Sequence, residues 1–519
     1  MAQIRTDTDI PSAFRATAAR RGEAPAVVSD AGVTSFAELD RQSDRLAAHL
    51  AAGGLQVGER VALYAINGAE FAAAYLGIQK AGGVVVPVNL LLNPEEIDYL
   101  LTDSGATAFV YHPAMAAGVA AVRERAVQVG QWISLGDPLA EGDAGWAAIQ
   151  AGSDPAPRVM LDPRRDLAAL LYTSGTTGRP KGAMLTHANL VSNTDSVTAA
   201  LELSADDRLL VVLPMFHAFA ATVGMLTPLL HGFSLVPLPR FEPAQVARAI
   251  GEHGATVFLG VPSMYALLLR LPDEAAAPLK GLRFCVSGGA AMPQAVMAAF
   301  EERFGVPVLE GDGPTECGPV TCVNPLHGER KPGTVGLPVP GVTMEIRDRE
   351  GRPLPDGETG EICVRGPSVM RGYWNRPDET AASFFGDFFR TGDLGVRDAD
   401  GYFAIIDRLK DLIIVNGMNV YPRVVEEVLY RHPAVAEAAV VGQPHELHGE
   451  IPVAYVALKE GQTADERALR EHCRAHLGRH EVPRRFVFMD ALPKNATGKI
   501  LKRELRKAGE VERGVVTAD

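Results

Sequence analysis

The eleven residues from Tyr172 to Gly182 carry the densest set of groups that could hold a phosphate chain. They read Tyr-Thr-Ser-Gly-Thr-Thr-Gly-Arg-Pro-Lys-Gly, with four serine or threonine hydroxyls, three glycines and one lysine. Glycine lets backbone N–H groups come close to a ligand, hydroxyls donate to oxyanions, and lysine adds a mobile charge. The spacing is not that of a Walker A loop, and a flexible surface loop is the alternative. The predicted phosphate-binding residues are Thr173, Ser174, Gly175, Thr176, Thr177, Gly178 and Lys181.

A second group of polar residues follows the apolar pair Val308-Leu309 and reads Glu310-Gly311-Asp312-Gly313-Pro314-Thr315-Glu316. A carboxylate such as Glu316 is a hard oxygen ligand, which suits a partly hydrated Mg²⁺ that bridges phosphates. The two glycines do not predict a dinucleotide-binding turn, because a third glycine and the start of a helix are missing. The alternative is a capped turn that binds nothing.

Three further residues could each contact a substrate. His217 follows the apolar run 209–213 in Pro-Met-Phe-His-Ala-Phe, where it is either a satisfied core histidine or a substrate contact. Asp393 in Arg-Thr-Gly-Asp could accept hydrogen bonds from a ribose diol, as in dinucleotide folds. Lys499 in Pro-Lys-Asn-Ala-Thr-Gly-Lys-Ile is by default a solvated surface charge.

In this order along the chain, the segments resemble the motifs of the adenylate-forming superfamily, which includes acyl- and aryl-CoA synthetases, firefly luciferase and the adenylation domains of peptide synthetases. The resemblance spans residues 172–499 and is closest in character to fatty-acyl- or aryl-CoA ligases. It implies an acid–thiol ligase, an AMP-forming acyl-CoA synthetase that acts through an acyl-adenylate on a hydrophobic fatty, aryl or polycyclic acid. The implied cofactors are ATP, Mg²⁺ and coenzyme A, and the products are acyl-CoA, AMP and diphosphate.

The resemblance also assigns roles to the matching residues. Lys499 would bridge the acyl carboxylate and the phosphate, Glu316 would contact the metal, and Lys410 would be the hinge of a mobile C-terminal domain. The implied catalytic set is Lys499, His217, Thr315, Glu316 and Lys181. Beyond the loop 173–181, the ATP site would contain Gly289, Ala290, Glu310, Gly311, Asp312, Thr315, Asp393, Arg408 and Lys499. The acyl pocket would contain Phe216, His217, Val261, Gly288, Gly289 and Gly313, and the coenzyme A side Gly417 and Met418.

Asp312 departs from the family's motif, which has a tyrosine whose ring flanks the adenine. The change loses a stacking contact worth about 1–3 kcal/mol and brings a negative charge near phosphates. Two alternative enzymes therefore stay open: a ligase impaired in adenylation that only converts a preformed acyl-adenylate to a thioester, and a loader of acyl groups onto a carrier protein. A nucleotide sensor without catalysis is a third alternative, although it would need no swinging lysine. Ala218 stands where amino-acid-activating relatives have aspartate, so an α-amino acid is not expected as the substrate.

The elements that must position these residues alternate between strand-like and helical segments. We expect helices at 34–50, 70–80 and 94–101, and strands at 61–64, 84–88, 106–111, 209–213, 256–259 and 282–286. Ser35 and Glu38 would form a capping box for the first helix. Such alternation predicts a largely parallel sheet covered by helices, with ligands at the carboxyl ends of the strands.

The expected fold class is α/β. Residues 1–407 would form a large N-terminal adenylate-forming domain of layered β/α sheets plus a small β-barrel, the latter indicated by the turn-rich segment 336–365. Residues 408–411 would be a hinge, and residues 412–519 a small mobile α+β C-terminal domain.

The composition of the chain limits the kinds of partner and the cellular location that we expect for it. The 519 residues include 50 basic and 63 acidic ones, and the net charge of −13 argues against binding to nucleic acid or anionic membranes. The five cysteines are scattered without a CxxC pair, which is typical of reduced thiols and predicts a cytoplasmic protein. The first residues lack the apolar stretch of a secretory signal, and no apolar run has the length of a membrane span.

Overall fold

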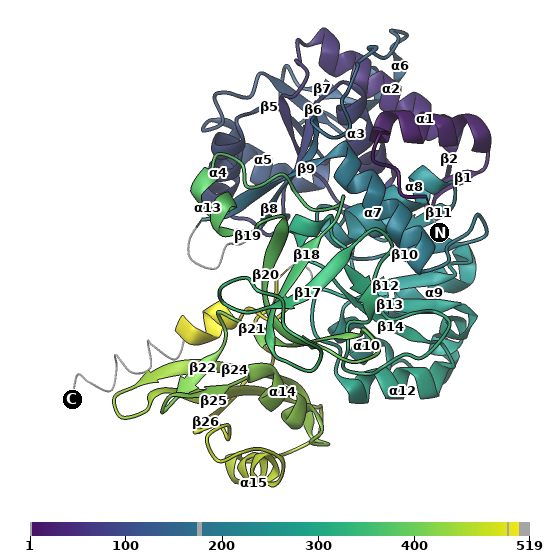
Figure 1. The fold of residues 1–519 in the computed structure, drawn as a ribbon. Coiled ribbons are helices and arrows are strands. Elements are labelled where there is room, and N and C mark those ends of the chain that lie inside the picture. Colours follow the sequence, from purple (N-terminus) through teal and green to yellow (C-terminus); the bar gives the residue numbers. More distant parts are fainter. Residues whose placement is uncertain (1–2, 174–178, 496–497, 508–519) are drawn as a thin grey trace.

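The computed structural model describes residues 3–173, 179–495 and 498–507. The first of its two large sheets has nine strands in the order β16-β15-β14-β13-β12-β10-β11-β1-β2 (Figure 1). The pairings from β1 through β14 along this order are parallel, and those of β2, β15 and β16 are antiparallel. The strands are β1 (Pro25–Ser29), β2 (Gly32–Ser35), β10 (Arg208–Val211), β11 (Ser234–Pro237), β12 (Val257–Gly260), β13 (Phe284–Ser287), β14 (Val308–Asp312), β15 (Cys322–Val323) and β16 (Leu337–Pro338).

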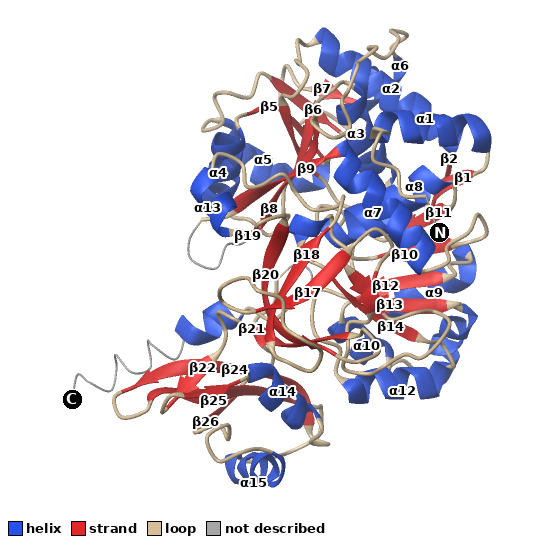
Figure 2. Ribbon diagram, viewed as in Figure 1, coloured by secondary structure: helices blue, strands red, loops and turns tan. Residues whose placement is uncertain are grey.

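The second large sheet has seven strands in the order β7-β6-β5-β3-β4-β8-β9, of which only the β8–β9 pairing is antiparallel. Its strands are β3 (Arg60–Tyr64), β4 (Val84–Pro87), β5 (Ala106–Tyr111), β6 (Gln131–Ser134), β7 (Ala144–Gly145), β8 (Leu167–Thr173) and β9 (Lys181–Thr186). The predicted α/β class, with a large N-terminal and a small C-terminal domain, is confirmed (Figure 2).

Helices cover both sheets; one large apolar core is shared between them, and a second, smaller core contains residues of β3, β4 and β5. Asn93 caps the fourth helix with a complete capping box to Glu96, whereas the box predicted at Ser35 is only half formed, with the Ser35 hydroxyl accepting from the N–H of Glu38 at 3.1 Å. The helices of this part are α1 (Ile10–Arg21), α2 (Phe36–Ala52), α3 (Ala69–Lys80), α4 (Pro94–Ser104), α5 (Ala116–Arg123), α6 (Trp146–Ala151), α7 (His187–Ala200), α8 (Thr227–His231), α9 (Pro243–His253), α10 (Pro262–Leu268), α11 (Asp273–Ala276), α12 (Gln294–Phe304), the π-helix η2 (Ala220–Leu226), and the 3₁₀ turns η1 (Pro113–Met115), η3 (Ala277–Gly281) and η4 (Thr315–Cys317).

Two local predictions need correction. The first long helix begins at Phe36 rather than at residue 34, because Thr34 pairs with Val27 in the sheet and Ser35 is the N-cap. The expected small barrel is a five-stranded antiparallel sheet, in which the ten-residue strand β20 pairs with three partners at different points along its length. Its elements are β17 (Thr343–Arg347), β18 (Gly360–Arg365), β19 (Phe384–Phe385), β20 (Phe388–Arg397) and β21 (Phe403–Arg408), with α13 (Pro377–Ala382) beside them.

The C-terminal part has its own sheet and its own core, as an α+β unit requires. Helices α14 (Pro422–Tyr430) and α15 (Glu466–His476) bury apolar faces against this sheet, which packs below the large domain in Figure 1. Its strands are β22 (Ile413–Val415), β23 (Met418–Val420), β24 (Val435–His445), β25 (Gly449–Leu458) and β26 (Arg485–Phe488). The expected boundaries at 407 and 412 stay a prediction.

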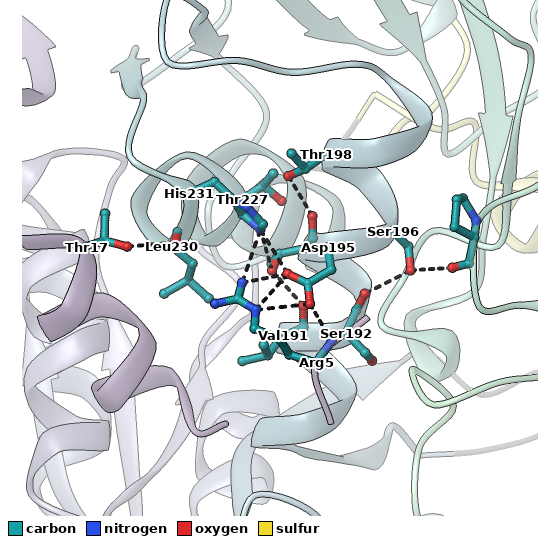
Figure 3. A network of polar contacts seen from close by, with 12 residues as sticks. Arg5, Thr17, Val191, Ser192, Asp195, Ser196, Thr198, Thr227, Leu230 and His231 are labelled. Carbon is teal, nitrogen blue, oxygen red and sulfur yellow. Dashed lines mark hydrogen bonds and ion pairs between the residues drawn. The ribbon is translucent and has the colours of Figure 1, made fainter. Parts of the chain in front are cut away.

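A polar network ties the N-terminal arm to α7 and α8 (Figure 3). The Arg5 guanidinium donates to the Asp195 carboxylate, with Nη2 and Oδ1 separated by 2.6 Å, and the Arg5 backbone N–H donates to Oδ2 at 2.7 Å. His231 Nε2 lies 3.2 Å from Asp195 Oδ1. On the same helix, the Ser196 hydroxyl donates to the Pro340 carbonyl at 2.7 Å. Helix α7 is therefore held both by the N-terminal arm and by the segment that contains Pro340.

Candidate active site

The carboxyl ends of three neighbouring parallel strands lie level and carry most of the predicted site segments. Gly260 of β12 pairs with Ser287 of β13, which pairs with Glu310 of β14. The chain leaves these strands into segments 261–263, 288–290 and 313–316, with Gly311 and Asp312 as the last residues of β14. Because parallel strands end at one edge of the sheet, the three segments gather there, as expected for a ligand site in an α/β fold.

A small cavity of about 60 Å³ opens at these strand ends. None of the described residues that line it is lysine or arginine, and its charged or titratable polar groups are His217 and Asp312. The glycine at 313 is required, because a Cβ there would lie 1.7 Å from the carbonyl oxygen of Pro319 on the opposite wall. The rest of the wall is mainly apolar and includes Val197, Ala200, Leu201, Phe219, Val223 and Val339.

Lys499 reaches this site from the C-terminal domain. The preceding Gly498 has a φ of +81°, and a Cβ on it would lie 3.0 Å from Ser263 Oγ and 3.1 Å from Val261 Cγ2, so the two domains touch here. The Lys499 side chain keeps solvent contact along the cleft. The surrounding protein atoms, and after them the cations Arg408 and Lys410, lower the pKa of its ammonium to about 8.

His217 lies at the cavity and faces the lysine. Burial, and then the nearby charge of Lys499, lower the pKa of His217 to about 4, so the imidazole is neutral at pH 7. The backbone N–H of Phe219 points at His217 Nδ1, at a distance of 3.4 Å. A neutral imidazole at this place can exchange hydrogen bonds with a carboxylate without forming an ion pair.

Glu316, the expected metal contact, is held by two hydroxyls. Tyr373 Oη donates to Glu316 Oε1 at 2.8 Å, and Thr173 Oγ1 lies 3.4 Å from the same oxygen. The backbone carbonyl of Glu316 accepts from the N–H of Met370 at 2.8 Å. The phosphate-loop end and the segment around 370–374 therefore converge on this carboxylate.

Lys181 lies at the start of β9, where its ammonium pairs with the Glu379 carboxylate of α13. The same ammonium lies 5.3 Å from the centre of the Tyr373 ring. The other predicted loop residues, Ser174 to Gly178, lie outside the described residues. Of the predicted loop, the structure thus places only its two ends.

A cluster of opposite charges stands at the mouth of the cavity. Arg408 Nε lies 2.7 Å from Asp393 Oδ1, and burial raises the pKa of Asp393 to about 6 in spite of this partner. Burial also raises the pKa of Asp312, and the charges of Arg408, Lys499 and Arg423 oppose that rise. The Asp312 carboxylate is therefore surrounded by cations rather than isolated.

Glu310 makes a contact between the domains that the sequence did not indicate. Arg423 Nη2 of α14 lies 3.8 Å from Glu310 Oε1, which also accepts the N–H of Met292 at 3.0 Å. Oε2 is buried and has no hydrogen-bond partner. Burial raises the pKa of Glu310 to about 7, with Arg423 acting in the opposite direction.

The structure brings together most, but not all, of the residues that the sequence singled out. Phe216 and Val261 are buried but do not line the cavity; Phe219, three residues after Phe216, lines it instead. Gly417 and Met418 form the β22–β23 turn, next to the segment of His448 in the C-terminal sheet, and are not among the residues at the cavity. The predicted residues that do line it are His217, Gly288, Gly289, Gly311, Asp312, Gly313 and Thr315.

Three functional contributions were missed: the α7 wall of the cavity, Arg423 and Tyr373. Helix α7 buries the polar run from Ser192 to Ser196, so no apolar periodicity pointed to it. Tyr373 is 57 residues from Glu316, its hydrogen-bond partner. The only local signal was an aromatic pair, Tyr373-Trp374, in an otherwise turn-like segment.

Comparison with known proteins follows the same two-part division. Residues 14–374 match the family model described as "AMP-binding enzyme", and residues 424–499 match "AMP-binding enzyme C-terminal domain". The chain is 40% identical over 474 residues to a sulfoacetate–CoA ligase of Cupriavidus necator, with 91% of this chain and 92% of that protein covered. It is 35% identical over 499 residues to a long-chain-fatty-acid–CoA ligase of Bacillus subtilis, with 91% and 89% covered.

Among solved structures, ATP-bound MatB from Rhodopseudomonas palustris superimposes with a TM-score of 0.87 and 36% identity, covering 96% of this chain and 99% of that one. Within the part of the chain that the structure describes, no helix combines the length and the apolar character needed to cross a bilayer.

Proposed function

The chain belongs to the AMP-binding enzyme family, and from that premise we propose that it is an AMP-forming acyl-CoA synthetase for hydrophobic monocarboxylic acids. Its relatives named above are acid–thiol ligases, which agrees with the resemblance seen in the sequence. The observation that carries the proposal is the placement of Lys499 at the mouth of an apolar cavity. An acid held in that cavity would present its carboxylate to the lysine.

The lining of the cavity supports an uncharged acyl tail. Sulfoacetate carries a second anion, and an enzyme that binds it needs a cation or several donors to replace the water around that anion. Here the described lining offers no lysine or arginine, and α7 and η2 contribute Val197, Leu201 and Val223. A fatty or aryl tail fits this lining because burying apolar surface is favourable at about 25 cal/mol per Å².

The chemistry needs positive charge, because two anions must meet. A carboxylate is a poor electrophile until its oxygen attacks the α-phosphate of ATP and AMP becomes the leaving group. The Lys499 ammonium, placed between His217 and the Asp312–Arg408 cluster, would stabilise the charge that builds up on phosphorus. The Thr315 hydroxyl at the cavity would donate to the α-phosphate, and Asp393 with Arg408 would hold the ribose.

Mg²⁺ fits the residues present, since Glu316 offers a carboxylate oriented by two hydroxyls, and hard oxygen ligands are what this ion prefers. Glu316 would hold the ion together with the phosphates of ATP. Once bound, Mg²⁺ supplies charge neutralisation on the phosphates.

The second half-reaction, attack of the coenzyme A thiol on the acyl-adenylate, would require the C-terminal domain to turn. In the arrangement described, Lys499 occupies the cleft, whereas the coenzyme A candidates Gly417 and Met418 lie elsewhere in the C-terminal domain. If the C-terminal domain turned about Lys410, which lies between β21 and β22, Lys499 would leave the cleft and the segment of Gly417 and Met418 would take its place. The five described cysteines are free and buried, which supports the proposal of a cytoplasmic enzyme.

Release of diphosphate tests the proposal. The enzyme is incubated with ATP, Mg²⁺ and one acid at a time: straight-chain saturated monocarboxylates of increasing length, benzoate, and the dianions malonate and sulfoacetate. We expect release with one or more of the apolar monocarboxylates, a thioester when coenzyme A is added, and little turnover of the dianions. Preferred turnover of a dianion would contradict the proposed substrate class.

The same assay distinguishes a complete synthetase from the alternative suggested by Asp312, a ligase impaired in adenylation. Thioester formation from a preformed acyl-adenylate, without diphosphate release from any acid, would identify a ligase impaired in adenylation. The charges of Arg408, Lys499 and Arg423 oppose the effect of burial on the pKa of Asp312, which supports competent adenylation. Faster transfer to a holo-carrier protein than to coenzyme A would instead identify a loader.

A further inference from the structure

Residues 370–374 form an extra edge beside the strand that starts with Lys181. The N–H of Trp374 donates to the Gly182 carbonyl at 2.8 Å, the N–H of Met184 donates to the Gly372 carbonyl at 2.9 Å, and the N–H of Arg371 donates to the Met184 carbonyl at 3.0 Å. This pairing puts the Tyr373 side chain between the phosphate-loop end and η4. Residues 370–374, which are distant in sequence from the phosphate loop and from η4, are thereby held against both of these segments.

Tyr373 contacts two of the residues that the proposed chemistry needs. Its hydroxyl donates to Glu316 Oε1 at 2.8 Å, and its ring lies 5.3 Å from the Lys181 ammonium. Its own backbone is fixed, because its N–H donates to Thr380 Oγ1 at 2.9 Å. Met370, in the same segment, holds the backbone carbonyl of Glu316. The segment therefore restrains Glu316 at both main chain and side chain.

We propose that Tyr373 is a positioning residue. Its hydroxyl aims the Glu316 carboxylate at the nucleotide-bound cation, and its ring keeps the Lys181 ammonium beside that carboxylate. This rests on the proposed function. Among the described residues, both hydroxyl contacts fall on Oε1, so the hydroxyls fix the plane of the carboxylate and leave Oε2 to face a cation. A carboxylate on a freely rotating side chain would have to be ordered each time the metal–nucleotide complex binds.

The variant Tyr373→Phe removes the hydroxyl and keeps the ring over Lys181. Two quantities are measured: the Mn²⁺ dissociation constant of the enzyme–ATP complex without acid, by electron paramagnetic resonance, and the Mg²⁺ concentration that half-saturates diphosphate release. We expect both to rise about tenfold, the usual effect of losing a hydrogen bond to a charged group, with the KM for the acid unchanged. Melting curves check that the variant is folded.

A matched control exists in the same domain. The Tyr402 hydroxyl donates to the Glu329 carbonyl at 2.6 Å, and its ring lies 4.6 Å from the Lys331 ammonium, so Tyr402→Phe deletes the same kind of hydroxyl away from the cleft. We expect it to change neither metal constant. An equal shift in both variants would overturn the inference, because the effect would then be general.

Mn²⁺ binding by the Glu316→Gln variant tells failure of the positioning role apart from failure of Glu316 as the metal contact. If Glu316→Gln weakens Mn²⁺ binding and Tyr373→Phe leaves it unchanged, the positioning role is overturned and the proposed function stands. If Glu316→Gln has no effect either, Glu316 is not the metal contact and the inference falls with it. If the wild type releases no diphosphate with any acid, the proposed function fails, while Mn²⁺ titration still tests the role of Tyr373.

Discussion

At the scale of single residues, Lys499 has the strongest predicted effect, because its ammonium faces His217, Asp312 and Asp393 at the cavity mouth. Lys499→Ala should lower the rate of acyl-adenylate formation by about 100- to 1,000-fold, the usual result of removing one aimed donor from such a site. Thioester formation from a supplied acyl-adenylate should stay near the wild-type rate. Lys494→Ala is the control, since that lysine on the same loop pairs with Glu437.

The pKa of Lys499, lowered to about 8, gives this prediction a pH dependence. The charged form is present below that pH and is lost above it, so adenylation should decline as the pH rises through about 8. An adenylation rate that stays level from pH 7 to pH 10, measured as diphosphate release, would contradict an ammonium acting in the step.

At the scale of elements, α7 and its C-cap Leu201 form one wall of the cavity proposed for the acyl tail, where α7 contributes Val197 and Ala200. Ala200→Phe should fill part of that space and lower kcat/KM for the longest accepted acid, relative to a short one, by about tenfold or more, because pockets discriminate by roughly that factor per misfit methylene. The neighbouring Ala199 is not a lining residue, so Ala199→Phe is the matched control. Equal losses for long and short acids in Ala200→Phe would refute a length-setting role.

The elements that local signals define were predictable, and those defined by tertiary contact were not. Helix α4 could be predicted from the sequence because the residues that mark its start, Asn93, Pro94 and Glu96, lie within four consecutive positions. Polar residues of α7 such as Asn193 are buried because they bond to distant backbone, in this case the carbonyl of Val320 at 2.8 Å. No sequence window contains both partners of such a bond.

In the candidate site, too, the residues marked by local sequence signals could be predicted, and those placed by tertiary contacts could not. Its motif residues at the ends of β13 and β14 could be read from glycines and acids after apolar runs, and the structure places Gly288, Gly289 and Gly313 at the cavity. Phe216 was predicted for the pocket, but Phe219 lines it, because the turn of the chain after β10 decides which aromatic side chain faces inward. Arg423 lies on another domain, and its approach to Glu310 depends on how the domains pack.

At the scale of the whole molecule, the Arg423–Glu310 pair joins the two domains in the arrangement that brings Lys499 to the cleft, and the proposed turn of the C-terminal domain would break it. Arg423→Gln should therefore favour the other arrangement and slow adenylation by about two- to fivefold, in line with a weak ion pair that spans 3.8 Å and in which only the arginine is partly exposed, without slowing thioester formation. The two half-reactions are measured separately. Arg431→Gln, at the exposed end of the same helix, is the control, and an effect of Arg423→Gln on both half-reactions alike would argue against a role in domain arrangement.

The arm that contains Arg5 has a practical consequence for anyone who shortens this protein. Without it, the Asp195 carboxylate would keep His231 as a neighbour but lose the guanidinium of Arg5; Asp195 lies on α7, the helix whose end lines the cavity. Trimming the start of the chain would thus loosen one wall of the cavity, although none of the trimmed residues lines the cavity itself. Acid preferences measured on a trimmed protein would then describe a less rigid pocket than the one in the untrimmed chain.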